Sequence, residues 1–284
     1  MQMSKIAFVA VALVIALVVV IGLAKTRNRA GDKNDVQPSS TVDTTNTIVD
    51  KPASESEPAP KASPESAAIS TAAKQNRYVF VTFYRKDDDA SKKMQAVLKP
   101  VQAKLSHRAS FVSVDVDDPV QQGVVSRYGA DRSPIPLTLV VAPNGAVTAG
   151  YPNEIKNADF SNAFVSSGMA GVIKAMQDQK LAVVCVQSPR TRHNKESLAA
   201  ARKLASAQEF AGATQLVQIN SADRGEAKLL KQLQVNASSP EAQVVVVAPP
   251  GKVAGKFSGA VPTETMVATV TQACGPGGSC GPSG

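Results

Sequence analysis

Between residues 76 and 178, segments with the apolar pattern of a β-strand alternate with segments whose apolar residues recur at helical spacing. Short apolar runs and one strictly alternating stretch are typical of buried strands, and the segments between them repeat apolar residues at helical spacing. A Pro-Asn-Gly turn separates the last two strands. The predicted order is β-α-β-α-β-β-α. The strands are predicted at 78–84, 111–117, 137–141 and 146–151, and the helices over the apolar positions 94–101, at 119–128 and at 158–177.

Residues 179–273 repeat this order at a spacing of roughly a hundred residues. The segment 139–145 has a counterpart at 245–251, where a run of valines again leads into a Pro-containing turn that ends in Gly. The pattern therefore predicts a second unit of the same α/β architecture. Its strands are predicted at 181–186, 213–220, 243–247 and 253–257, and its helices at 197–210, 224–235 and 262–273.

Several residues of the first unit resemble those of the thioredoxin family. An aromatic pair ends the first strand at 83–84, and the stretch 113–117 is similar to the family's central strand. Ile135-Pro136 stands where the family has its cis-proline, ahead of a strand that ends in Asn-Gly. The resemblance implies an α/β fold with two tandem thioredoxin-like α/β/α sandwiches, at 76–178 and, more divergent, at 179–273. Pro136 is then a cis-proline, the alternative being an ordinary proline at a strand edge.

The family's C-x-x-C motif falls on residues 88–91, where Asp88 and Ser91 replace the two cysteines. Disulfide exchange needs a thiolate nucleophile and a resolving thiol, and a carboxylate and a hydroxyl supply neither. We therefore expect no dithiol oxidoreductase, no enzyme of another class and no cofactor. The simplest interpretation of Asp87–Asp89 is a helix N-cap. A second interpretation is that Asp88, Ser91 and the Pro136 loop line a groove for a protein or peptide partner.

Other residues with chemical potential have simpler interpretations. His193 shows no acid or cysteine partner in a recognisable motif, so we expect a solvent-facing loop histidine. Cys185 lies in the middle of a strand and is predicted to be a buried, inert thiol. Asp115 and Asp117 share one strand face, but with no third ligand or EF-hand loop we expect a solvated strand end and no metal site.

The N-terminal 1–30 segment contains nineteen consecutive residues, 6–24, without a charged or strongly polar side chain. As a helix this run spans roughly 28 Å, about the thickness of a bilayer core. We expect an uncleaved transmembrane anchor, the alternative being a cleaved signal peptide. Lys25, Arg27 and Arg29 follow the span, which by the positive-inside rule favours a cytoplasmic bulk. However, a short N-terminal tail followed by a span, a spacer and soluble domains is the usual plan of an exported bacterial protein. We therefore favour export of the soluble domains.

Polar segments flank the two units. Residues 31–75 are rich in Ser, Thr, Pro and Ala and are predicted to be a disordered linker. Residues 274–284 are predicted to be a flexible Gly/Pro tail that carries Cys274 and Cys280. These two thiols could close a disulfide loop, bind a soft cation or join two chains, or they could be idle.

The net charge of +8 raises the question of nucleic acid. Part of the surplus flanks the apolar N-terminal run, and the rest is scattered without aromatic interleaving, so we expect no nucleic-acid binding. The sequence therefore favours a membrane-tethered, non-catalytic binding or scaffolding protein. The alternative is thiol-redox or soft-metal handling through Cys274 and Cys280.

Overall fold

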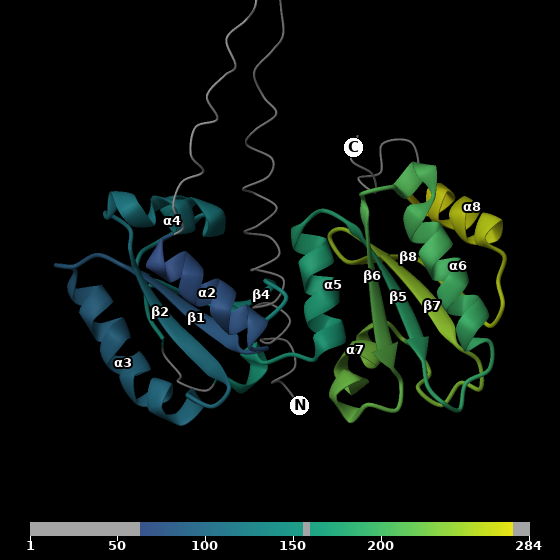
Figure 1. The fold of residues 1–284 in the computed structure, drawn as a ribbon, viewed down its shortest axis with the longest axis horizontal. Helices are drawn as coiled ribbons and strands as arrows, with labels where there is room; N and C mark the ends of the chain where they lie inside the picture. The colour runs from purple at the N-terminus through teal and green to yellow at the C-terminus, as the bar shows by residue number, and fades with distance from the viewer. Residues whose placement is uncertain (1–62, 156–159, 275–284) are drawn as a thin grey trace, which may run out of the picture.

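The computed structural model describes residues 63–155 and 160–274, which form two four-stranded sheets with helices packed on them (Figure 1). The predicted membrane span at 6–24, the linker up to residue 62 and Cys280 lie outside the described residues. Within the described ranges, no helix combines the length and the apolar character needed to cross a bilayer.

The first sheet has the strand order β2-β1-β3-β4. Its central strand β1 is parallel to β2 and antiparallel to β3, and β4 is antiparallel to β3. The four predicted strands are therefore confirmed, although β2 starts and ends two residues earlier than predicted because its last residue pairs with the end of β1. The bounds are β1 (Tyr78–Tyr84), β2 (Ala109–Asp115), β3 (Leu137–Val141) and β4 (Val147–Pro152).

Helices cover both faces of this sheet. On one face, α2 (Pro64–Lys74) and α4 (Gln122–Tyr128) pack in one core cluster with alternate residues of β1. On the other face, α3 (Asp89–Leu105) packs in the cluster that contains Phe80 and Val140. This division follows from the alternation of side chains along a strand, which places Phe80 opposite to its neighbours. Two short 3-10 turns, η1 (Pro119–Gln121) and η2 (Ala130–Arg132), flank α4.

Helix α2 lies in a segment that was predicted to be disordered, so that prediction is wrong for residues 64–74. The Ser63 side chain accepts a hydrogen bond from the Ser66 amide and caps the helix. Ile69 and Ala72 are buried against the sheet. The segment has few apolar residues, so packing on the sheet, which is not visible locally, stabilises a helix that its composition alone would not.

The second sheet repeats the first, with the order β6-β5-β7-β8, a parallel pair β5–β6, and β7 antiparallel to both of its neighbours. The predicted repeat of strands is therefore confirmed. The bounds are β5 (Leu181–Gln187), β6 (Thr214–Asn220), β7 (Gln243–Ala248), β8 (Lys252–Ser258), α6 (Asn194–Ser206), α7 (Ala227–Gln232) and α8 (Thr263–Cys274), with 3-10 turns η4 (Gln208–Phe210) and η5 (Arg224–Glu226).

Helix α5 (Ser167–Gln177) does not close the first unit as predicted for 158–177. That range contains a 3-10 turn, η3 (Ser161–Ala163), and then α5, which lies between the two sheets in Figure 1. Met169, Val172 and Met176 of α5 belong to the core cluster of β5 and β6. Helix α5 therefore covers β5 and β6 of the second sheet in the way that α2 covers β1 and β2 of the first. Periodicity predicts a helix but does not tell which sheet the helix covers.

Helix α5 also contacts the first unit. The Gln177 side chain donates a hydrogen bond to the Val147 carbonyl (2.8 Å) and accepts one from the Val147 amide (3.0 Å). The Tyr78 hydroxyl bonds to the backbone of Val165, just before the helix. The same helix is thus part of the second core and is tied to the edge strand of the first sheet.

Candidate functional site

The positions of the family's two cysteines form a closed helix cap. The Asp88 carboxylate accepts hydrogen bonds from the Ser91 amide (2.8 Å) and from the Ser91 hydroxyl (2.7 Å). The Ser91 oxygen is buried and accepts a further bond from the Arg85 amide (3.2 Å). The hydrogen bonds from Ser91 hold the pKa of Asp88 below its ordinary value. Asp88, within the run 87–89 predicted to cap the helix, is therefore the N-cap of α3.

The peptide bond between Ile135 and Pro136 is cis, as the resemblance implied. Pro136 is buried and directly precedes β3, and its carbonyl accepts a hydrogen bond from the Asn153 amide (2.7 Å). Asn153 in turn lines a cavity of about 330 Å³ beside the first turns of α3. That cavity has an apolar floor with one positive and one negative side chain at its rim. It is lined by Ala90, Lys93, Met94, Val97, Asn153, Glu154 and Ile155.

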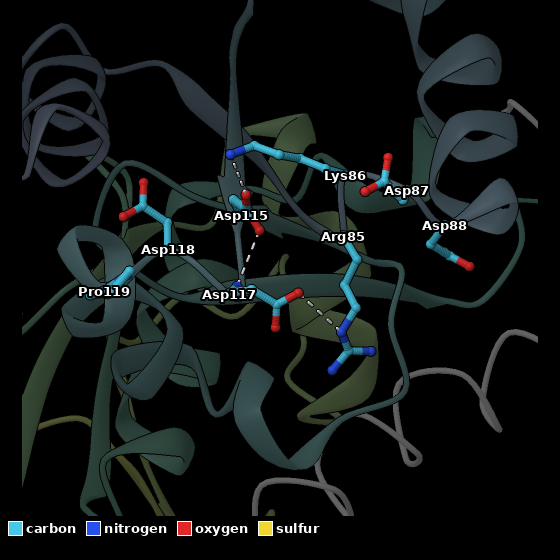
Figure 2. Close-up of a pocket in the computed structure, with 8 residues that line it drawn as sticks. All are labelled: Arg85, Lys86, Asp87, Asp88, Asp115, Asp117, Asp118 and Pro119. Carbon is cyan, nitrogen blue, oxygen red and sulfur yellow. Dashed lines mark hydrogen bonds and ion pairs between the residues drawn. The ribbon is translucent and has the colours of Figure 1, made fainter.

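A larger cavity, of about 760 Å³, lies where β1 and β2 end (Figure 2). Asp115 is buried there, and its carboxylate lies 3.1 Å from the Lys86 ammonium group. The hydrogen bond to Asp115 raises the pKa of Lys86. Asp117, which is exposed, pairs with Arg85 at 3.5 Å. The expected solvated strand end is therefore correct for Asp117 and wrong for Asp115, whose cation, Lys86, lies in the turn that follows β1.

The acids of this cavity do not assemble as a metal centre. Within 63–155 and 160–274, no group of three or more His, Cys, Asp or Glu side chains is arranged to hold an ion. The eight residues that line the cavity include two cations among its acids, as Figure 2 shows: Arg85, Lys86, Asp87, Asp88, Asp115, Asp117, Asp118 and Pro119.

In the second unit the loop before α6 is pinned to the segment that precedes β7. The Arg192 amide donates to the Pro240 carbonyl (2.8 Å), and the Ala242 amide donates to the Arg192 carbonyl (3.0 Å). Ala242 directly precedes β7, as Pro136 directly precedes β3. The segment that precedes β7 is therefore hydrogen-bonded to the loop before α6.

His193 is an exposed loop histidine, as predicted, but it has an acidic partner that the prediction did not include. Its Nε2 lies 3.6 Å from a carboxylate oxygen of Glu241, and Arg192 pairs with the other oxygen of the same carboxylate. Sequence inspection missed Glu241 because it lies 49 residues beyond Arg192. The two basic residues and the acid reinforce the backbone link between this loop and β7.

The two described cysteines differ in environment. Cys185 is a free, fully buried thiol, as predicted, and burial raises its pKa to about 11. Cys274 is the last residue of α8 and packs partly buried against the second core, so it does not belong to the flexible tail as predicted. Cys274 is disulfide-bonded. Neither cysteine is placed as a thiolate at a helix N-terminus, where thioredoxin chemistry requires it.

The sequence matches no protein-family model and no curated protein. The solved structures to which it is similar are thioredoxin-like proteins. The thioredoxin Deadhead of Drosophila melanogaster is 19% identical, with a TM-score of 0.28, over 34% of this chain and 85% of its own. Human ERp44 is 13% identical, with a TM-score of 0.32, over 74% of this chain and 56% of its own. The first two thioredoxin domains of Naumovozyma dairenensis Eps1p are 10% identical, with a TM-score of 0.28, over 71% of this chain and 94% of their own. At identities and TM-scores this low, we draw no conclusion about activity or partners from these proteins.

Proposed function

We propose that this protein is a membrane-tethered, non-catalytic thioredoxin-like protein that binds a protein or peptide through its first unit. The observation that carries the proposal is the mutual hydrogen bonding of Asp88 and Ser91 at the two cysteine positions. A dithiol site must present a thiolate to a substrate disulfide. Here the carboxylate is used in capping α3 and the hydroxyl is buried beneath it.

The cavity beside α3 supports binding without chemistry. Met94, Val97 and Ile155 give it apolar surface, and Lys93 and Glu154 offer one charge of each sign. Binding sites commonly combine an apolar floor with a few polar groups that fix the orientation of the ligand. We therefore assign partner binding to the first unit, where this cavity lies.

The tether belongs to the proposal as well. The uncharged run at 6–24 has the length of a membrane span, and the polar segment that follows it would hold the folded units away from the bilayer. We place these units on the exported side of the membrane. A disulfide at Cys274 supports that assignment, because disulfides persist in oxidising compartments.

The same disulfide supports a second candidate, thiol-redox or soft-metal handling through Cys274 and Cys280. A disulfide whose Cys274 is only partly buried could be reduced and reformed by thiol exchange. Thiol titration combined with metal analysis of protein taken directly from cells separates the two functions. Bound metal, or two thiols that cycle with the redox state of the cell, would favour the second candidate.

The binding proposal is tested by photo-crosslinking in native membranes. A photoreactive amino acid at position 93 lies in the groove, whereas the same amino acid at Lys99 lies on the exposed surface of the same helix, outside the groove. We expect a discrete crosslinked product from position 93 and none from position 99. Equal products from both positions, or none from either, would refute binding at this groove.

A further inference from the structure

A further cavity, of about 360 Å³, lies on the side of the molecule where α4 ends and α5 meets β4. It is lined by the end of α4 and the following η2 turn, by the turn into β4, and by the last turn of α5. The two hydrogen bonds between Gln177 and Val147 hold the α5 wall against the β4 wall. The cavity shares no lining residue with the groove beside α3, so it is a separate site.

Hydrogen-bond donors dominate the lining. Arg127, Arg132 and Lys174 bring three cations, and Asp178 is the only acid among the residues that line the cavity. Asp178 is already paired with Lys174 on the same helix. A guanidinium or ammonium group can only donate hydrogen bonds, so a ligand with several acceptor oxygens and negative charge complements these walls.

Two of the donors lack a strong partner in the described part of the chain. The Arg127 guanidinium lies over the Tyr128 ring, 5.5 Å from its centroid, with no carboxylate of the described residues in ion-pair range. The Tyr128 hydroxyl is buried and has no hydrogen-bond partner among the residues that the structure describes. Burial also raises the pKa of Tyr128, so the hydroxyl keeps its proton and remains a donor at neutral pH. A buried hydroxyl without a partner is costly, so Tyr128 marks the cavity wall as incompletely satisfied.

Helix dipoles explain only part of this arrangement. Arg127 lies in the last turn of α4 and Lys174 in the last turn of α5, where cations interact favourably with the helix end. That effect does not account for Arg132, which lies beyond α4 and pairs with Asp131 at 3.7 Å, or for the Tyr128 hydroxyl, which has no partner among the described residues. The four groups have in common that they line one cavity.

We propose that this cavity binds a phosphate group, either as the free ion or as the head of a small phosphate monoester. Phosphate offers the planar guanidinium group paired acceptor oxygens, and arginine is the side chain that best matches that geometry. The volume is in the range of small-ligand sites. The site is independent of partner binding beside α3, so either proposal can fail without the other.

Isothermal titration calorimetry on the full chain in detergent micelles tests this site, with inorganic phosphate and phenyl phosphate as probes at constant ionic strength. We expect saturable one-to-one binding. Arg127→Gln and Arg132→Gln should each weaken it about tenfold, because a hydrogen bond to a charged group is worth on the order of 1.5 kcal/mol or more. Both side chains are exposed, so neither variant should alter folding, and unchanged thermal unfolding checks this.

The matched control is Arg190→Gln, which removes an exposed arginine from the second unit, outside the cavity. Tighter binding of phenyl phosphate would assign a phosphate monoester, and equal or tighter binding of inorganic phosphate would assign the free ion. Absence of saturable binding with both probes would overturn the proposal. So would equal weakening by the control and by the two cavity variants, which would indicate a nonspecific effect of net charge.

Discussion

Replacing Glu226 by alanine is expected to loosen α5 from the second sheet. Glu226 is only 2% exposed and directly precedes α7. Its carboxylate accepts hydrogen bonds from the Gly168 amide (2.9 Å) and the Ser166 hydroxyl (2.6 Å) at the start of α5. A carboxylate at this end of a helix also interacts favourably with the helix dipole. The change therefore removes the polar anchor of α5.

The size of the effect follows from these contacts. The buried Gly168 amide loses its acceptor, which costs about 1–3 kcal/mol. Loss of the charge at the helix N-terminus adds up to about 1 kcal/mol. Ser166 is only partly buried and can turn toward water, so we assign its bond a smaller share. The expected loss in the free energy of unfolding is about 3 kcal/mol, and Glu226→Gln, which keeps an acceptor oxygen, should lose about half of that.

Urea unfolding of a chain that begins at Lys33, followed by circular dichroism, measures this loss. Glu209→Ala is the matched control, because Glu209 is exposed and surface changes of this kind usually stay within about 0.5 kcal/mol. Hydrogen exchange should also show faster exchange across the amides of α5 in Glu226→Ala. If Glu226→Ala and the control unfold at the same urea concentration, the assignment of α5 to the second unit through this anchor is refuted.

Three further predictions concern the thiols, the helix cap and the membrane. Cys185 should react with a small alkylating reagent only after denaturation, because it is buried with its pKa raised to about 11, and rapid labelling of folded protein would show that the second core is open. The lowered pKa of Asp88 means that its contribution to stability is complete above the ordinary aspartate pKa and is lost as the pH falls below about 4. Asp88→Asn should therefore flatten the pH dependence of stability in that range. Parallel stability profiles for the variant and the unmodified chain would contradict the cap. The full chain should stay in membranes after carbonate washing while a chain from Lys33 dissolves without detergent, and a mature form cleaved near Lys25 would instead establish a signal peptide.

The strands and the cap of α3 could be predicted because their signals are local. A central strand with both faces buried, such as β5, reads as a continuous apolar run. An aspartate ahead of a helical pattern indicates an N-cap, and Asp88 is one. The repeat of strand order along the chain then predicted two similar sheets.

What the sequence did not reveal depends on contacts between distant residues. Helix α2 has little apolar surface of its own and is stabilised by the sheet on which Ile69 packs. The pairs Lys86–Asp115 and His193–Glu241 join segments that only the sheets bring together. The cavity at Tyr128 likewise needs α5 beside β4, a placement that helical periodicity cannot give.

Reduction of insulin disulfides by the full chain, with dithiothreitol as the reductant, tests the central claim most directly. With Asp88 and Ser91 at the two cysteine positions, the rate should not exceed that of dithiothreitol alone. Asp88→Cys combined with Ser91→Cys restores both thiols at the start of α3 and provides the matched comparison. Turnover by the unmodified chain that survives Cys274→Ser and Cys280→Ser would contradict the claim that this site performs no dithiol chemistry.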